Sequence, residues 1–133
     1  MLALPQEPRC PLGETFVDAR GVIVNVLELA DPSLSIHGVA LITSKAGTER
    51  SNHYHRGDFH WLYVLSGEAH YQERGVGESQ YPPPGVFKAG EMFFTPAMRE
   101  HRVFFPVDTV LLSMSRYSRR HVEHEGDVVR VDK

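Results

Sequence analysis

Short apolar runs, separated by turn-forming residues, follow one another along most of the chain. The runs cover residues 22–29, 36–43, 52–55, 59–65, 69–73, 92–95, 102–105, 109–117 and 128–131. No stretch keeps the period that an amphipathic helix would need. Short strands divided by frequent turns are typical of an antiparallel sandwich or a closed barrel. The pattern therefore predicts an all-β protein.

One long segment, residues 74–91, interrupts this rhythm. It contains the run Pro82-Pro83-Pro84, which favours an extended polyproline conformation and cannot lie in a central strand. We expect a loop here, with at most short edge strands. Long loops often act as lids, so residues 75–88 are a candidate cover for a cavity.

The length of the chain, 133 residues, suits one domain. Without an internal repeat or a change of composition, we expect a single domain over 1–133. Within it we expect an irregular N-terminal arm at 1–14, a barrel at 15–117 and a charged C-terminal tail at 118–133. Cys10 is the only cysteine, so no intrachain disulfide can form.

The charge balance narrows the range of partners. Asp and Glu outnumber Lys and Arg by 17 to 14, which gives a net charge of −3 with neutral histidines. Nucleic-acid binding would need a clustered basic patch, which the sequence does not have. The N-terminal residues carry no signal-peptide pattern, and no apolar run is long enough to cross a membrane. We therefore expect a cytoplasmic protein that binds neither nucleic acid nor membranes.

Eight histidines stand out in a domain of this size, and four of them fall in two short segments. In a strand, residues i and i+2 point to the same side, so His53 and His55 project together. A bend over the next residues would bring His60 beside them. A proline-controlled turn followed by a returning strand would do the same for His101. A lone histidine in a strand is usually only a half-buried polar residue. It is the joint spacing that favours a metal site.

That spacing resembles the two sequence motifs of the cupin family. For the first motif the matching positions are Gly47, His53, His55, His60 and Gly67, and for the second they are Gly90, Pro96, Met98, His101 and Phe105. The two matches cover residues 47–67 and 90–105. The resemblance implies a single-domain double-stranded β-helix, which is the cupin or jelly-roll barrel. It also implies one divalent transition metal (Zn, Ni, Mn or Fe) bound by His53, His55, His60 and His101.

Three positions depart from the family motifs. His60 replaces a glutamate, Met98 replaces a turn glycine and Phe105 replaces an asparagine. The first change matters for the chemistry, because four neutral imidazoles leave the full charge of a divalent ion uncompensated. Such a site is a stronger Lewis acid and favours an anionic ligand or an enolate.

A narrower resemblance concerns the segment around the first motif. The sequence Thr48 to Gln72 is similar to the cupin domains of nucleotide-sugar-modifying enzymes of polysaccharide biosynthesis. The stretch Phe16-Val17-Asp18-Ala19-Arg20-Gly21 resembles the opening of that group and of deoxysugar epimerases. The resemblance implies a sugar-nucleotide substrate and isomerase or epimerase chemistry. An ordinary turn with a surface ion pair would explain the second stretch equally well.

Other residues are candidates for catalysis and substrate binding. Glu100 and His70 are candidate acid–base groups, and Arg99 is a candidate for binding a phosphate or carboxylate. We expect Phe94 and Met114 to line the barrel and contact substrate.

Strand alternation gives an expectation about oligomeric state. If His60 faces inward, so do Leu62 and Val64, while Trp61 and Tyr63 face outward, as does Phe59. An outer aromatic row would suit an interface between two copies, so we expect a homodimer.

Three functions fit these observations, and each takes a small-molecule ligand. The first is a metal-dependent isomerase or epimerase acting on a sugar or sugar nucleotide. The second is a metal-dependent dioxygenase acting on a chelating small molecule, with Fe or another redox metal. The third is a non-catalytic ligand-binding cupin whose metal site is closed. We rank them in that order.

Overall fold

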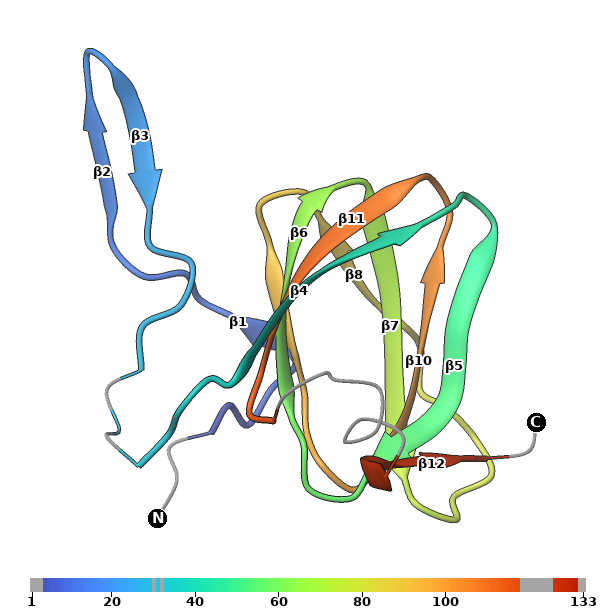
Figure 1. The fold of residues 1–133 in the computed structure, drawn as a ribbon. Coiled ribbons are helices and arrows are strands. Elements are labelled where there is room, and N and C mark those ends of the chain that lie inside the picture. Colours follow the sequence, from blue (N-terminus) through green and yellow to red (C-terminus); the bar gives the residue numbers. More distant parts are fainter. Residues whose placement is uncertain (1–3, 30, 32, 118–125, 132–133) are drawn as a thin grey trace.

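The computed structural model describes residues 4–29, 31, 33–117 and 126–131, and these form two five-stranded antiparallel sheets that face each other (Figure 1). The first sheet has the order β1 (Arg9–Cys10), β9 (Met92–Thr95), β6 (His60–Ser66), β11 (Thr109–Ser115) and β4 (Gly38–Ser44). The second has the order β12 (Val128–Arg130), β5 (Thr48–His55), β10 (Arg99–Phe105), β7 (Glu68–Gly75) and β8 (Gly85–Lys88). The fold is nearly all β, as the sequence predicts, and its two packed sheets match a jelly-roll sandwich.

Most predicted strands are present, with ends that differ by a few residues. The exception is the run 22–29, because β3 (Gly21–Val24) ends at Val24 and the chain then continues without regular structure. Three short strands, β1, β2 (Thr15–Asp18) and β8, were not predicted individually. Two or four residues carry too little periodicity to identify a strand, so only the neighbouring strands reveal these elements.

Two apolar clusters lie on opposite sides of the first sheet. The first lies between the sheets and includes the predicted inward residues Leu62 and Val64. The second lies on the outer side and includes Phe59, Trp61 and Leu34. The outer aromatic row is therefore not exposed: Phe59 is 2% and Trp61 3% accessible. Apolar side chains that precede β4 in the same chain pack there, so burial of this row needs no second copy: Leu4, Leu12, Val26, Leu27, Leu29, Leu34 and Ile36.

The hairpin of β2 and β3 forms a separate two-stranded sheet that projects away from the two main sheets (Figure 1). Residues 15–24, which the sequence places in the barrel, thus lie outside it. Within the tail predicted from residue 118, residues 118–125 and 132–133 lie outside the described part, whereas 128–130 form β12 as expected. Among the described helical residues, no segment has the length and apolar character needed to cross a membrane.

Candidate metal centre

Three imidazoles converge at one end of the space between the sheets. His53 and His55 lie on β5, and His101 lies on β10 directly opposite His53. The ring centroids of His53 and His101 are 4.4 Å apart, and those of His53 and His55 are 5.3 Å apart. One nitrogen from each of the three rings lies within 4.8 Å of the other two, an arrangement that could hold a metal ion.

Two ring nitrogens of this group lie close to oxygen atoms. Nδ1 of His55 lies 3.3 Å from Oδ2 of Asp127, and Nδ1 of His101 lies 3.3 Å from the carbonyl oxygen of Arg99. Burial, reinforced by the nearby His53, lowers the pKa of His101 to about 3. His101 is therefore neutral near pH 7, and a neutral imidazole is the form that binds a metal.

His60 belongs to a second group of potential ligands, which overlaps the first at His55. Its Nε2 and Oδ2 of Asp58 are 2.9 Å apart, and both side chains are almost fully buried. Burial alone would raise the pKa of Asp58, but the hydrogen bonds from His60 and from the backbone amides of Tyr117 and Phe59 outweigh it and lower that pKa. His60 shares a second potential metal group with His55 and Asp58. The ring centroids of His55 and His60 are 4.6 Å apart.

A cavity of about 240 Å³ opens beside these imidazoles. Its lining includes all four histidines. The apolar lining residues are Ile42, Leu62, Val103, Phe105 and Leu111, and the other polar ones are Arg50, Thr95 and Arg130. The cavity therefore has a histidine end, an apolar wall and two guanidinium groups.

Four charged residues at this site are absent from the sequence prediction: Arg50, Asp58, Asp127 and Arg130. Arg50 stands three positions before His53, which would normally put the two side chains on opposite faces. The pairing of β5 with β10 shifts register between His101 and Arg102, so that the backbone register skips Asn52. This bulge returns Arg50 to the inner face. The role of Asp58 could have been predicted from its spacing to His60, because residues i and i+2 of an extended segment point to the same side.

The structure corrects the expectation for Glu100. Along β10, His101 and Val103 line the cavity, so Glu100 points to the opposite face. There its Oε2 accepts a hydrogen bond from Nε of Arg74 at 2.6 Å. Burial opposes ionisation, but the hydrogen bond from Arg74 prevails and lowers the pKa of Glu100. A paired carboxylate on the outer face cannot act as a base inside the cavity.

The loop after β7 packs on that same outer face. The guanidinium groups of Arg74 and Arg102 lie 4.1 and 4.2 Å from the ring centroid of Tyr81. Nε2 of Gln72 donates to the carbonyl of Pro82 at 2.8 Å. In this arrangement the loop covers the second sheet rather than the cavity, contrary to the expectation of a lid.

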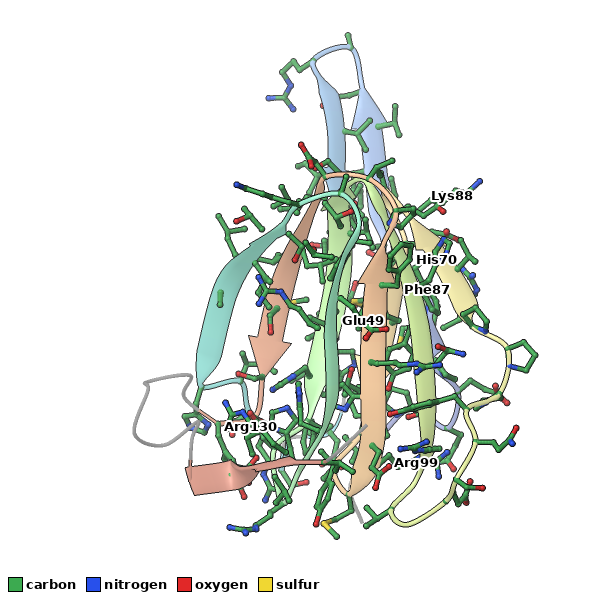
Figure 2. The ribbon with its side chains drawn as sticks, turned by 90° about the vertical axis from the view of Figure 1, so that its right-hand side faces the viewer. Glu49, His70, Phe87, Lys88, Arg99 and Arg130 are labelled. Atoms are coloured by element: carbon green, nitrogen blue, oxygen red, sulfur yellow. The ribbon has the colours of Figure 1, made fainter. Side chains whose placement is uncertain are left out.

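His70 also points outward, and Figure 2 places it far along the molecule from Arg99 and Arg130. Its Nε2 lies 2.5 Å from Oε2 of Glu68. The inward neighbour on β7 is Tyr71, which belongs to the inner cluster. A shift of one residue along a strand exchanges the inward and outward faces, and the sequence of β7 does not fix this position. Tyr71 faces inward, so its neighbour His70 lies outside the cavity.

The three expected substrate-binding residues also lie outside the cavity lining. Phe94 and Met114 belong to the outer cluster beneath the N-terminal segment. On β9 and β11 the side chains next to them in sequence are the ones that face inward. Arg99 lies at the histidine end of β10 (Figure 2), where its Nε is 3.5 Å from Oε2 of Glu73.

Comparison with known families and sequences gives one clear result. The sequence model of the cupin domain family matches residues 40–115. This match covers more than half of the chain and includes the four histidines of the cavity. A comparison with curated protein sequences finds no significant match.

Solved structures with a similar fold include two sugar isomerases and a protein of capsular polysaccharide assembly. A dTDP sugar isomerase from Desulfovibrio desulfuricans has a TM-score of 0.71 at 12% identity, covering 99% of this chain and 87% of that one. The 3,4-ketoisomerase QdtA from Thermoanaerobacterium thermosaccharolyticum, in complex with TDP, has a TM-score of 0.66 at 17% identity, covering 88% and 82%. The capsular polysaccharide assembling protein CapF from Staphylococcus aureus has a TM-score of 0.64 at 20% identity. This chain spans about a third of the CapF chain, covering 33% of it. At these identities the likeness concerns the fold.

Proposed function

Because this chain belongs to the cupin domain family, we propose that it is a metal-dependent isomerase or epimerase acting on a sugar nucleotide. The observation that carries the proposal is the convergence of three imidazole nitrogens on a cavity that also presents guanidinium groups. The structural relatives that act on TDP sugars make the same substrate class a reasonable choice. One of them was solved with TDP-4-keto-6-deoxyglucose.

The donor set fits a divalent transition metal. His53, His55 and His101 would hold it, and His101 is neutral because its pKa is about 3. Imidazole ligands suit Zn, Ni, Mn and Fe, and three of them leave positions for substrate oxygens. A bound ion would polarise a carbonyl oxygen of the substrate. The fourth ligand expected from the sequence, His60, stays a prediction.

The cavity walls suit the two ends of such a substrate. Arg50 is held by hydrogen bonds from Nε to Oγ of Ser44 at 3.0 Å and from Nη2 to the carbonyl of Thr43 at 2.9 Å. A guanidinium fixed in this way is a suitable partner for a phosphate oxygen. The apolar wall, which includes Leu62 and Phe105, would face carbons of the sugar that carry no hydroxyl.

A proton must move between neighbouring carbons during a keto isomerisation, so the site needs an acid–base group. We assign this role to His60, which lines the cavity while its Nε2 donates to Asp58. That hydrogen bond fixes the tautomer and leaves Nδ1 to accept a proton. Asp58 thereby acts as a positioning residue for His60.

The direct test is to incubate metal-loaded protein with TDP-4-keto-6-deoxyglucose in D2O and follow the sugar by NMR. We expect a new keto sugar and deuterium at the carbon next to the carbonyl. His60→Gln should abolish deuterium uptake but keep most of the bound metal, whereas His101→Gln should lose metal binding. His37→Gln is a matched control because His37 lies outside the cavity lining.

The same experiment separates the alternatives. Oxygen consumption with an iron-loaded protein and a chelating substrate would support the dioxygenase instead. Tight binding of the sugar nucleotide without conversion or deuterium uptake would support a non-catalytic binding protein. If His60→Gln loses metal as severely as His101→Gln, then His60 is a ligand, as the sequence spacing suggested.

A further inference from the structure

The C-terminal strand β12 lies directly against the strand that carries two of the imidazoles. Its three residues, Val128–Arg130, pair in antiparallel register with residues 53–55. The backbone N–H of Arg56 donates to the carbonyl of Asp127 at 3.0 Å, which extends the contact by one residue. Figure 1 shows β12 crossing the end of the second sheet. No catalytic or binding role was predicted for this segment from the sequence. Its backbone nevertheless pairs with the strand that carries His53 and His55.

Asp127, which immediately precedes this strand, is hydrogen-bonded to the bend after β5. Its Oδ1 accepts a hydrogen bond from the backbone N–H of Gly57 at 2.8 Å, and its Oδ2 accepts one from the N–H of Asp58 at 3.2 Å. The same Oδ2 lies 3.3 Å from Nδ1 of His55, whose side chain is 1% accessible. A carboxylate at this place favours the tautomer with the proton on Nδ1. The lone pair of Nε2 then remains available to a metal.

Arg130, at the other end of the strand, lines the same cavity as the histidines. It is the register partner of His53, and Figure 2 shows it at the same end of the molecule as Arg99. Arg50 from β5 lines this cavity as well. Two guanidinium groups on one small cavity, in a chain with a net charge of −3, indicate an anionic ligand rather than general surface charge.

We propose that β12 completes the site: Asp127 is a positioning residue that orients His55, and Arg130 binds a phosphate of the substrate. The inference rests on the proposed function, because both roles concern the same metal and the same sugar nucleotide. It adds the C-terminal strand to the site. It also predicts that residues outside the match to the cupin model, which ends at residue 115, control the affinity for metal and for substrate.

The role of Asp127 is tested with Asp127→Asn, which preserves size and can still accept from Gly57. We expect Zn²⁺ to bind about 10- to 100-fold more weakly. In metal-free protein, the ¹⁵N shifts of the His55 ring should move away from the Nδ1–H tautomer. Asp108→Asn is the matched control, since Asp108 accepts a similar backbone hydrogen bond from Ala46 outside the cavity lining. Unchanged Zn²⁺ affinity together with an unchanged tautomer would overturn the assignment.

The role of Arg130 is tested by binding of TDP to Arg130→Gln. We expect the affinity for TDP to fall about tenfold or more, with Zn²⁺ affinity unchanged. Arg20→Gln on the β2–β3 hairpin, where Arg20 pairs only with Asp18 among the described ion pairs, should bind TDP like the wild type. TDP binding by Arg130→Gln at wild-type affinity would overturn the inference and leave the proposed function standing. If the wild type binds neither Zn²⁺ nor TDP, the proposed function is overturned, and the inference with it.

Discussion

At the scale of single residues, Met98 shows what a departure from a family motif costs. It is the one non-glycine among the described residues with a positive φ, 59°, and it stands where the cupin motif has glycine. Its backbone N–H donates to the carbonyl of His55 at 2.8 Å, so the turn also anchors the histidine strand. The left-handed conformation disfavours a side chain with a Cβ atom.

Met98→Gly should therefore raise the free energy of unfolding by up to ~1 kcal/mol, measured by urea denaturation. The neighbouring Ala97, which has no positive φ, provides the control. Ala97→Gly should lower the free energy of unfolding by roughly 0.5–1 kcal/mol, because it only adds freedom to the unfolded chain. Destabilisation of similar size by both changes would mean that Met98 is not strained.

Burial of neutral His101 makes stability depend on pH. Its pKa is about 3 in the folded protein and about 6.5 in the unfolded chain, so the unfolded state binds the extra proton first. The free energy of unfolding of metal-free protein should be constant above pH 6.5 and fall as the pH drops from 6.5 towards 3. Asp58, whose pKa is also lowered, contributes only below about pH 4. Denaturation at several pH values should show a slope for the wild type between pH 6.5 and 4. His101→Gln should flatten it, and an equal slope in that variant would contradict the assignment.

Much of the site could be predicted at this scale, for a definite physical reason. Strand alternation is strict, so the pattern His53-Tyr54-His55 brings two imidazoles to one face. The same rule fails for Arg50, because the bulge at Asn52 reverses the alternation and leaves no mark in the sequence. It fails for His70 because an error of one residue in a strand exchanges the two faces.

At the scale of elements, the N-terminal segment before β4 is a structural cover. Its described residues between Val24 and Gly38 form no regular strand, yet its apolar residues pack on the outer aromatics of the first sheet. The sequence predicted the outward facing of Trp61 and Tyr63 but not what buries them. A long irregular segment has no periodicity from which its packing partner could be deduced.

A substitution at Leu34, which is 9% accessible, would show how much this segment contributes to the free energy of unfolding. Leu34→Ala should lower the free energy of unfolding by about 2–4 kcal/mol, because it leaves a cavity against Phe59 and Trp61. Val39→Ala, at a position 66% accessible, should change it by less than about 0.5 kcal/mol. Chemical denaturation gives both values. Equal effects would show that the segment does not pack on the sheet in solution.

At the scale of the whole molecule, the homodimer stays a prediction, but its basis has changed. The aromatic row that suggested it is buried within one chain. Exposed apolar side chains lie instead on the β2–β3 hairpin, where Val17 is 73% and Ile23 64% accessible, and on β4, where Val39 is 66% accessible. Isolated two-stranded hairpins are barely stable in water, so a partner surface would account for this one.

If the hairpin forms an interface, Ile23→Glu should convert a dimer into monomers, as measured by light scattering after size-exclusion chromatography. Val107→Glu, at another exposed apolar position, 48% accessible, should leave the dimer intact. A wild-type protein that remains monomeric throughout the accessible concentration range would contradict the prediction.

The metal site is tested most directly by the metal content of untagged protein purified without chelators. We expect about one equivalent of a divalent transition metal per chain in the wild type and none in His101→Gln. The converse result would be wild-type protein that contains no metal and takes up none when Zn²⁺, Ni²⁺, Mn²⁺ or Fe²⁺ is added. That result would contradict the central claim that the three converging imidazoles form a metal site.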